Sequence, residues 1–210
     1  MNNNFAILKK WLRIERSFPI ILIVFGLLAV GASMMINIEK VGLLQHPENK
    51  LVCDLNPVYS CGKVIDSNQS TLVASIPNDL MGIAIFAPII AVGVSMLAGA
   101  KYKRWFWRLF LACMAAFMLG VAWLFYQSVY VIQALCIFCS TVWISGLTIT
   151  TALYAWVYDQ KLLPNRFQKM PIASIKRKNI IGIWIIIILI AAGLIITHFW
   201  YYYGQYFGVK

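Results

Sequence analysis

Two pairs of cysteines are the residues in this chain whose types and spacing could do chemistry. Cys53 and Cys61 stand eight residues apart in CDLNPVYSCG, and Cys136 and Cys139 form a C-x-x-C within an apolar stretch. Thiols arranged in pairs can exchange electrons through successive disulfides, without a metal, when the pairs meet in space. Whether these pairs meet depends on the elements that position them.

The composition indicates where these elements lie. Of the 210 residues, 61% are hydrophobic and 12% are charged, whereas soluble domains have roughly 45 to 50% apolar and about 25% charged residues. The chain is therefore expected to be an integral membrane protein. Its net charge of +11 does not indicate nucleic acid binding, because membrane topology itself requires basic residues beside apolar spans.

Five apolar stretches predict five transmembrane helices, at approximately 20–37, 80–98, 107–130, 137–158 and 180–200. Residues 109–158 contain no charged side chain and, at about 1.5 Å per residue, are too long for one crossing of about 30 Å of hydrocarbon. They should form two helices with a tight turn between Gln127 and Gln133. Residues 1–210 are thus predicted to form a single integral membrane domain, with one long exported loop at 38–79.

The distribution of basic residues predicts the orientation of these spans. Lys and Arg near span ends prefer the cytoplasm, and 14 of the 18 lie before the first span, between the second and third, or between the fourth and fifth. The N terminus is therefore expected in the cytoplasm. The first span could instead be a signal peptide, because Gly31, Ala32 and Ser33 are small and follow a basic segment, but the other spans would keep their orientation.

With this topology, both cysteine pairs are expected on the exported side. The loop between the first and second spans and the turn between the third and fourth must emerge from the same face. The exported compartments of bacteria, like the endoplasmic reticulum lumen, are oxidising, so cysteines there are expected to form disulfides.

Several interpretations of the pairs remain open at this point. Cys53 and Cys61 alone could form a structural disulfide, and all four cysteines together could hold zinc. A thioredoxin-like domain is not indicated, because nothing in the chain alternates strand and helix. The C-x-x-C instead begins a helix, where unpaired backbone N–H groups and the helix dipole favour a thiolate. At a bilayer edge such a dithiol could exchange with a water-facing pair and with a lipid-soluble acceptor, of which a quinone is the obvious example.

Taken together, these residues resemble the vitamin K epoxide reductase family. The resemblance is carried by the eight-residue spacing with CG at the second loop cysteine, by IPNDLMG at the start of the second span, and by the C-x-x-C that opens the fourth. It covers essentially the whole helical core.

The resemblance implies an all-α membrane protein, with a four-helix transmembrane bundle around a quinone site and a fifth transmembrane helix beside it. In the implied relay, Cys53 and Cys61 accept electrons from a partner. Cys61 then exchanges with Cys136, and Cys139 faces the quinone, which is ubiquinone or menaquinone. No metal is expected at the site.

Three further residues match positions near the quinone in the family. Asn78 is expected to donate a hydrogen bond to a quinone carbonyl, although Pro77-Asn78-Asp79 could also be a helix cap. Ser67 matches a loop position near the quinone but could simply be solvated. Trp143 stands where the vertebrate enzyme has a tyrosine, and its indole N–H can still donate, although a Trp at a bilayer edge is also an ordinary anchor.

The resemblance also implies a partner and a location. Similar bacterial members oxidise a DsbA-like thioredoxin-fold protein, which implies a bacterial inner (plasma) membrane with the active site on its periplasmic or extracytoplasmic side. Many members carry a fused thioredoxin-like domain, whereas this chain ends at Lys210, so a separate partner polypeptide is expected. The alternatives are a thiol-driven quinone epoxide reductase and a non-enzymatic membrane protein with structural or zinc-binding cysteines.

Other conspicuous residues are expected to be structural. Cys113 lies within the third span and is interpreted as a small buried hydrophobe. Trp105, Trp107 and Trp200 stand at span ends, as is typical of interfacial anchors. His198 has no neighbouring ligand cluster and is also interpreted as structural. No Walker loop or dinucleotide-binding glycine pattern supports a nucleotide cofactor.

Overall fold

The computed structural model of the protein describes residues 14–46, 51–73, 76–162 and 177–200, which are mostly helical. The long helices are α2 (Ile14–Gln45), α4 (Asn78–Leu97), α5 (Arg104–Tyr126), α6 (Ile137–Asp159) and α8 (Arg177–His198). Between α2 and α4 lie the short helix α3 (Cys61–Ile65), the 3₁₀ turn η1 (Asn68–Ser70) and two antiparallel strands, β1 (Thr71–Val73) and β2 (Ile76–Pro77).

Four helical segments in the described part of the chain are long and apolar enough to cross a membrane: Ser17–Gln45, Asn78–Leu97, Arg104–Ile132 and Ile137–Asp159. Their outward faces carry large apolar side chains, such as Leu27 and Leu119, which hydrocarbon would cover. The prediction of an all-α membrane protein is confirmed. The predicted fifth span falls on α8, whose apolar described part, Trp184–His198, is shorter.

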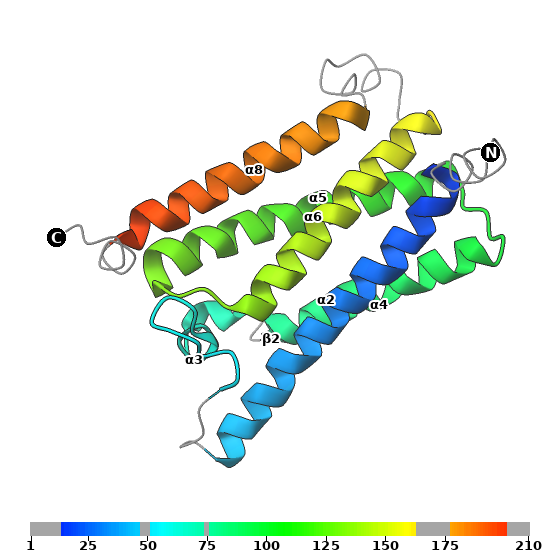
Figure 1. The fold of residues 1–210 in the computed structure, drawn as a ribbon. Helices are drawn as coiled ribbons and strands as arrows, with labels where there is room; N and C mark the ends of the chain where they lie inside the picture. Colours follow the sequence, from blue (N-terminus) through cyan, green and yellow to red (C-terminus); the bar gives the residue numbers. More distant parts are fainter. Residues whose placement is uncertain (1–13, 47–50, 74–75, 163–176, 201–210) are drawn as a thin grey trace, which may run out of the picture.

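Helix α2 is central to the bundle, because it packs along both α4 and α6, while α5 packs on α6 (Figure 1). Glycines allow α2 and α4 to approach closely. A Cβ atom on Gly82 would collide with the Ser33 hydroxyl, and one on Gly93 would lie 2.9 Å from the Pro19 carbonyl oxygen. This packing fixes the start of α4 against the second half of α2.

Aromatic rings fill the core at the other end of the bundle, between the start of α2 and the end of α6. Phe18 stacks on Trp156 with ring centroids 5.0 Å apart, and it contacts Trp107 at 5.9 Å. Trp107 is only 4% exposed, so the expectation that it anchors the interface was wrong, because it turns inward onto Phe18. Trp105 and Trp200 are exposed, as expected for interfacial anchors.

Helix α2 is longer than predicted. The predicted span ends at 37 and the predicted loop begins at 38, but α2 continues to Gln45. Between the predicted end at 37 and Pro47 the chain contains no proline that would interrupt the helix. Pro47 itself disfavours helix at the residue before it. Beyond the predicted end, the Glu39 carboxylate accepts the backbone N–H of Val52 at 3.4 Å. The loop is therefore shorter than predicted and is tied to the end of α2.

The connection from α5 to α6 also differs from the predicted tight turn. Residues Gln127–Ile132 continue α5 as a π-helix, η2, and the chain reverses only at Gln133. Gln133 has φ of 56°, a left-handed conformation that is uncommon for residues other than glycine. The Ala134 N–H donates to the Ser128 carbonyl at 3.1 Å and closes this wide turn. The turn delivers the chain to Cys136 at the start of α6.

Candidate active site

The loop that carries Cys61 docks onto the turn that carries Cys136. The Leu135 N–H donates to the Val58 carbonyl at 2.7 Å, and the Ser60 N–H donates to the Leu135 carbonyl at 3.0 Å, so that a short parallel β-bridge joins the two segments. Cys61 directly follows Ser60, and Cys136 directly follows Leu135. The bridge therefore sets the two cysteines side by side.

The structure brings the four predicted cysteines together. Cys53 and Cys61 are joined by a disulfide, and Cys136 and Cys139 are thiols. The Cys61 Sγ lies 3.3 Å from the Cys136 Sγ. One helical turn further on, the Cys139 N–H donates to the Cys136 Sγ at 3.3 Å. The sulfur atoms thus form a continuous path along which disulfides can be exchanged.

Side chains within the loop hold the disulfide segment in shape. The Asn56 Oδ1 accepts the N–H groups of Val58 at 3.0 Å and Tyr59 at 2.8 Å, as Asn does in tight turns. The Asp54 Oδ1 accepts the Gly62 N–H at 3.1 Å. The Asp54–Gly62 bond joins the two ends of the disulfide segment independently of the disulfide.

The surroundings of Cys136 favour its thiolate. The pKa of Cys136 is lowered, chiefly because the Cys139 side chain donates a hydrogen bond to its sulfur; backbone N–H groups of Cys139 and Phe138 lower it further, while burial and the Asp54 carboxylate raise it. Cys136 is the N-cap residue of α6, where the helix dipole acts in the same direction. The thiolate is the form that attacks a disulfide.

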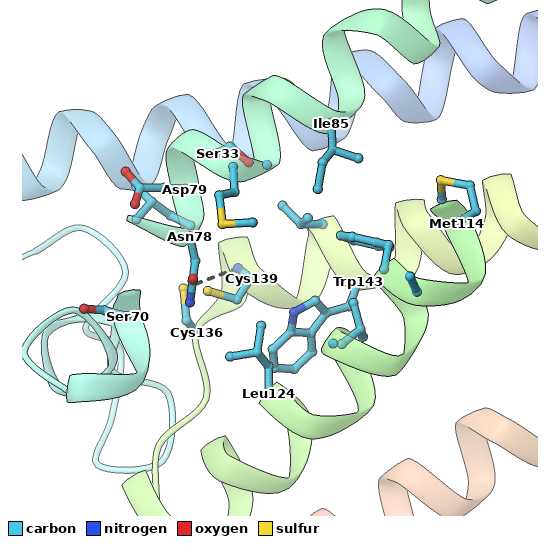
Figure 2. A pocket seen from close by; sticks show the side chains of 18 of the residues that line it. Ser33, Ser70, Asn78, Asp79, Ile85, Met114, Leu124, Cys136, Cys139 and Trp143 are labelled. Atoms are coloured by element: carbon cyan, nitrogen blue, oxygen red, sulfur yellow. Dashed lines mark hydrogen bonds between the residues drawn. The ribbon is translucent and has the colours of Figure 1, made fainter. Parts of the chain in front are cut away.

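The helices form a partly open cavity of about 710 Å³ beside the C-x-x-C. Residues of α2, α4, α5 and α6 line it, and most of their lining side chains are apolar. Five of its polar side chains lie in the loop between α2 and α4 or at the start of α4: Ser67, Gln69, Ser70, Asn78 and Asp79. The others include Ser33, Lys40 and Ser128. Figure 2 shows Cys139, Asn78 and Trp143 around this space. Cys139 therefore connects the path of sulfur atoms to the apolar cavity.

Residues 20–156 match the model of the vitamin K epoxide reductase family. The match spans both cysteine pairs and most of the four helices that line the cavity. The chain belongs to this family. No curated protein matches the chain. Membership makes the protein an oxidoreductase, of a family that couples thiols to quinones or their epoxides.

In this vitamin K epoxide reductase family member, Asn78 lines the cavity at the start of α4. Its Nδ2 donates to the Gln69 carbonyl at 2.7 Å, which ties η1 to α4. Pro77 is the N-cap residue and Asn78 the first residue of the helix. The alternative that Asn78 caps α4 is therefore wrong, because its amide bonds across to the loop instead.

Ser67 and Trp143 also line the cavity. Ser67 is half-buried rather than fully solvated, and its hydroxyl donates to the Val64 carbonyl at 2.7 Å. Trp143, one turn past Cys139 on α6, packs edge-on against Phe125 with ring centroids 6.1 Å apart. The three residues that the resemblance indicated thus share one cavity with Cys139.

Two cavity residues differ from what the sequence indicated. Cys113 is exposed and lines the cavity from α5, so the expectation that it is buried was wrong, because the bundle is hollow there. Asp79 lines the cavity and was not predicted as a site residue; it is 7% exposed, and its Oδ2 has no hydrogen-bond partner among the described residues. The sequence did contain a signal for Asp79, because it is an acidic residue at the start of an apolar span. A buried, unpaired carboxylate is costly, so such a residue is a candidate for a functional site.

The alternative that the four cysteines hold zinc can be compared with the described residues. Among them, no three His, Cys, Asp or Glu side chains are grouped so that they could hold a metal ion. Cys53 and Cys61, which a four-cysteine zinc site would require as thiolates, are joined as a disulfide. The arrangement suits thiol-disulfide exchange.

Proposed function

We propose that the protein is a quinone-dependent thiol-disulfide oxidoreductase of a bacterial inner membrane. It oxidises a separate DsbA-like thioredoxin-fold protein on the exported side and passes the electrons to a membrane quinone. One observation carries the proposal: the Cys61 Sγ is 3.3 Å from the Cys136 Sγ, while Cys139 of the same C-x-x-C lines an apolar cavity. A pair in a loop outside the spans is thereby coupled to a site for a lipid-soluble molecule.

The cavity fits a quinone in size and chemistry. Its volume of about 710 Å³ lies within the range of roughly 300 to 1,000 Å³ for ligand pockets, which are mostly apolar with a few polar groups. The Trp143 indole N–H and the Asn78 amide are donors suited to quinone carbonyls. A quinone bound there would supply an acceptor for two electrons and two protons.

Thiol exchange within the protein accounts for the transfer of both electrons. A thiolate of the partner attacks the Cys53–Cys61 disulfide, and the partner's second thiol resolves the mixed disulfide, which leaves the partner oxidised and both loop cysteines reduced. The Cys61 thiolate then attacks Cys136 of a Cys136–Cys139 disulfide, with Cys139 as leaving group. Attack of Cys53 on Cys61 releases Cys136 and restores the loop disulfide.

The redox states in the structure correspond to the end of this internal transfer, because the loop pair is a disulfide and the C-x-x-C is a pair of thiols. The lowered pKa of Cys136 makes it a good leaving group when Cys53 attacks Cys61. The same property would favour the reverse attack, so the exchange is readily reversible. Oxidation of the C-x-x-C by the quinone, at Cys139, would therefore set the direction of the exchange.

The test is quinone absorbance over time, with the purified protein in lipid, a reduced thioredoxin-fold partner, and ubiquinone, menaquinone or a quinone epoxide in parallel. Quinone loss is expected, and it should disappear in Cys139→Ala. Thr141→Ala is the matched control, because Thr141 lies on the same turn of α6 but bonds its hydroxyl back to Ile137. Consumption of the epoxide alone would favour the epoxide reductase, and no turnover with unreactive cysteines would favour structural disulfides.

A further inference from the structure

The far end of α8 reaches the segment that positions the reacting cysteines. Phe199, which follows α8 directly, is 0% exposed and packs with Val58, Val129 and Leu135, which are themselves buried. Val58 and Leu135 are the residues joined by the 2.7 Å backbone hydrogen bond of the docked loop. The Phe199 ring and the β-bridge are therefore parts of one packed unit.

Contacts outside the loop hold α8 in place. The Trp184 Nε1 donates to the Thr151 Oγ1 of α6 at 3.3 Å. At the other end, the His198 ring lies edge-on to the Tyr130 ring of η2, with centroids 4.9 Å apart. Figure 1 shows this end of α8 beside the end of α5, where η2 begins. Phe199 thus contacts the loop from a position that the loop does not determine.

The docked loop hides both of its sulfur atoms. Cys53 is 3% exposed and Cys61 is 0% exposed. Thiol-disulfide exchange requires access to the sulfur that is attacked, so no partner cysteine can react with either residue until the loop moves. The relay therefore needs a docked state for exchange between Cys61 and Cys136, and an undocked state for exchange with the partner.

We propose that Phe199 is a positioning residue that sets the balance between these two states, so that the fifth helix controls when the loop pair reacts internally and when it reacts with the partner. This inference rests on the proposed function. The ring packs with Val58 of the loop only when the loop is docked, so its removal shifts the population toward the undocked state. Internal exchange then slows, and reaction with outside reagents accelerates.

The first measurement is the rate at which Cys61 and Cys136 form a disulfide. The full chain carries Cys53→Ala, Cys113→Ala and Cys139→Ala, and diamide, which oxidises two thiols to one disulfide, is added to the protein in lipid. Adding Phe199→Ala should slow the bridging about tenfold, and Phe199→Leu should restore most of the rate. Ile196→Ala is the matched control, because it removes an apolar side chain from an exposed position of α8.

The second measurement is the rate of alkylation of Cys53 by a soluble maleimide, in the full chain with the other four cysteines replaced by alanine. Phe199→Ala should accelerate this reaction about tenfold, and Ile196→Ala should leave it unchanged. A change in the two rates in opposite directions supports the inference.

Three outcomes would count against it. Unchanged rates in Phe199→Ala would overturn the role of Phe199 and leave the relay intact. Absence of bridging even with Phe199 in place would overturn the proposed function together with this inference. A general loss of fold in Phe199→Ala, seen as loss of helical circular dichroism, would assign the residue to stability alone, unless Phe199→Leu folds and shows the same opposed changes to a smaller extent.

Discussion

The Cys61 Sγ and the Cys136 Sγ lie 3.3 Å apart, although 75 residues separate them in the chain. Their proximity is not a consequence of either cysteine motif. It arises from two backbone hydrogen bonds between the loop and the turn before α6, which involve Val58, Ser60 and Leu135. The contact couples the cysteine pair of the loop to the C-x-x-C at the start of α6.

Cys139→Ala is expected to abolish quinone reduction while the loop pair still reacts with the partner. Cys136 is the cysteine of the C-x-x-C whose Sγ lies 3.3 Å from the Cys61 Sγ, and Cys139 lines the cavity one helical turn further on. A thioredoxin-fold partner without its resolving cysteine should therefore accumulate a mixed disulfide with the variant, visible on a non-reducing gel. An active Cys139→Ala enzyme would contradict the proposed order of the relay.

The reactivity of Cys136 should depend on pH in a way that two substitutions change in opposite directions. The Cys139 side chain lowers the pKa of Cys136 and the Asp54 carboxylate raises it. A lower pKa means that the thiolate forms at lower pH. Cys139→Ala should therefore move the pH profile of Cys136 alkylation to higher pH, and Asp54→Asn should move it to lower pH.

Peptide mass spectrometry after timed alkylation at a series of pH values would measure these profiles. Asp66→Asn serves as the control, because Asp66 is an exposed carboxylate that does not act on Cys136. Identical profiles in all variants would mean that loop opening, rather than thiolate formation, limits the reaction.

Asp79→Asn is expected to stabilise the fold. The Asp79 side chain is buried, and its Oδ2 has no hydrogen-bond partner among the described residues. A buried group without a partner costs about 1 to 3 kcal/mol, and more when it is charged, and an amide of the same shape carries no charge. Thermal unfolding in detergent, followed with a thiol-reactive dye, should show a higher midpoint. A lower midpoint would indicate that the carboxylate is stabilised where it lies, by the N-terminus of α4 or by a group outside the described residues.

Gly93→Ala is expected to destabilise the contact between α2 and α4. A Cβ atom at Gly93 would lie 2.9 Å from the Pro19 carbonyl oxygen and 2.8 Å from the Ile23 Cγ1. Overpacking of this kind costs typically about 1 to 3 kcal/mol. Gly31→Ala is the matched control, because a Cβ there would meet nothing within 4 Å, and alanine in a helix is favoured over glycine by roughly 1 kcal/mol. Unfolding midpoints should therefore change in opposite directions.

Several features were predictable because they depend on properties that are local in the chain. The length of an apolar stretch is set by the thickness of the bilayer, so the all-α membrane fold followed from hydropathy. The end of α2 did not, because hydropathy marks where a helix leaves hydrocarbon and not where it stops. The helix continues to Gln45, and Glu39 then contacts the loop.

The cavity residues divide in the same way. Asn78, Ser67 and Trp143 were indicated by resemblance to a family, and all three line the cavity. The exposure of Cys113 to the cavity was not predictable, because it depends on where four helices leave a space between them. A hydropathy pattern records that a residue is in a span but not which side of the helix faces a cavity.

The sequence by itself determined the class of fold, the number of apolar stretches and the identity of the four cysteines, since composition, span length and motif spacing are properties of the chain alone. The tertiary structure decided which cysteines touch. The meeting of Cys61 with Cys136, and the burial of Phe199 against Val58, depend on hydrogen bonds and packing between segments far apart in sequence. Such contacts arise only when all the helices are in place.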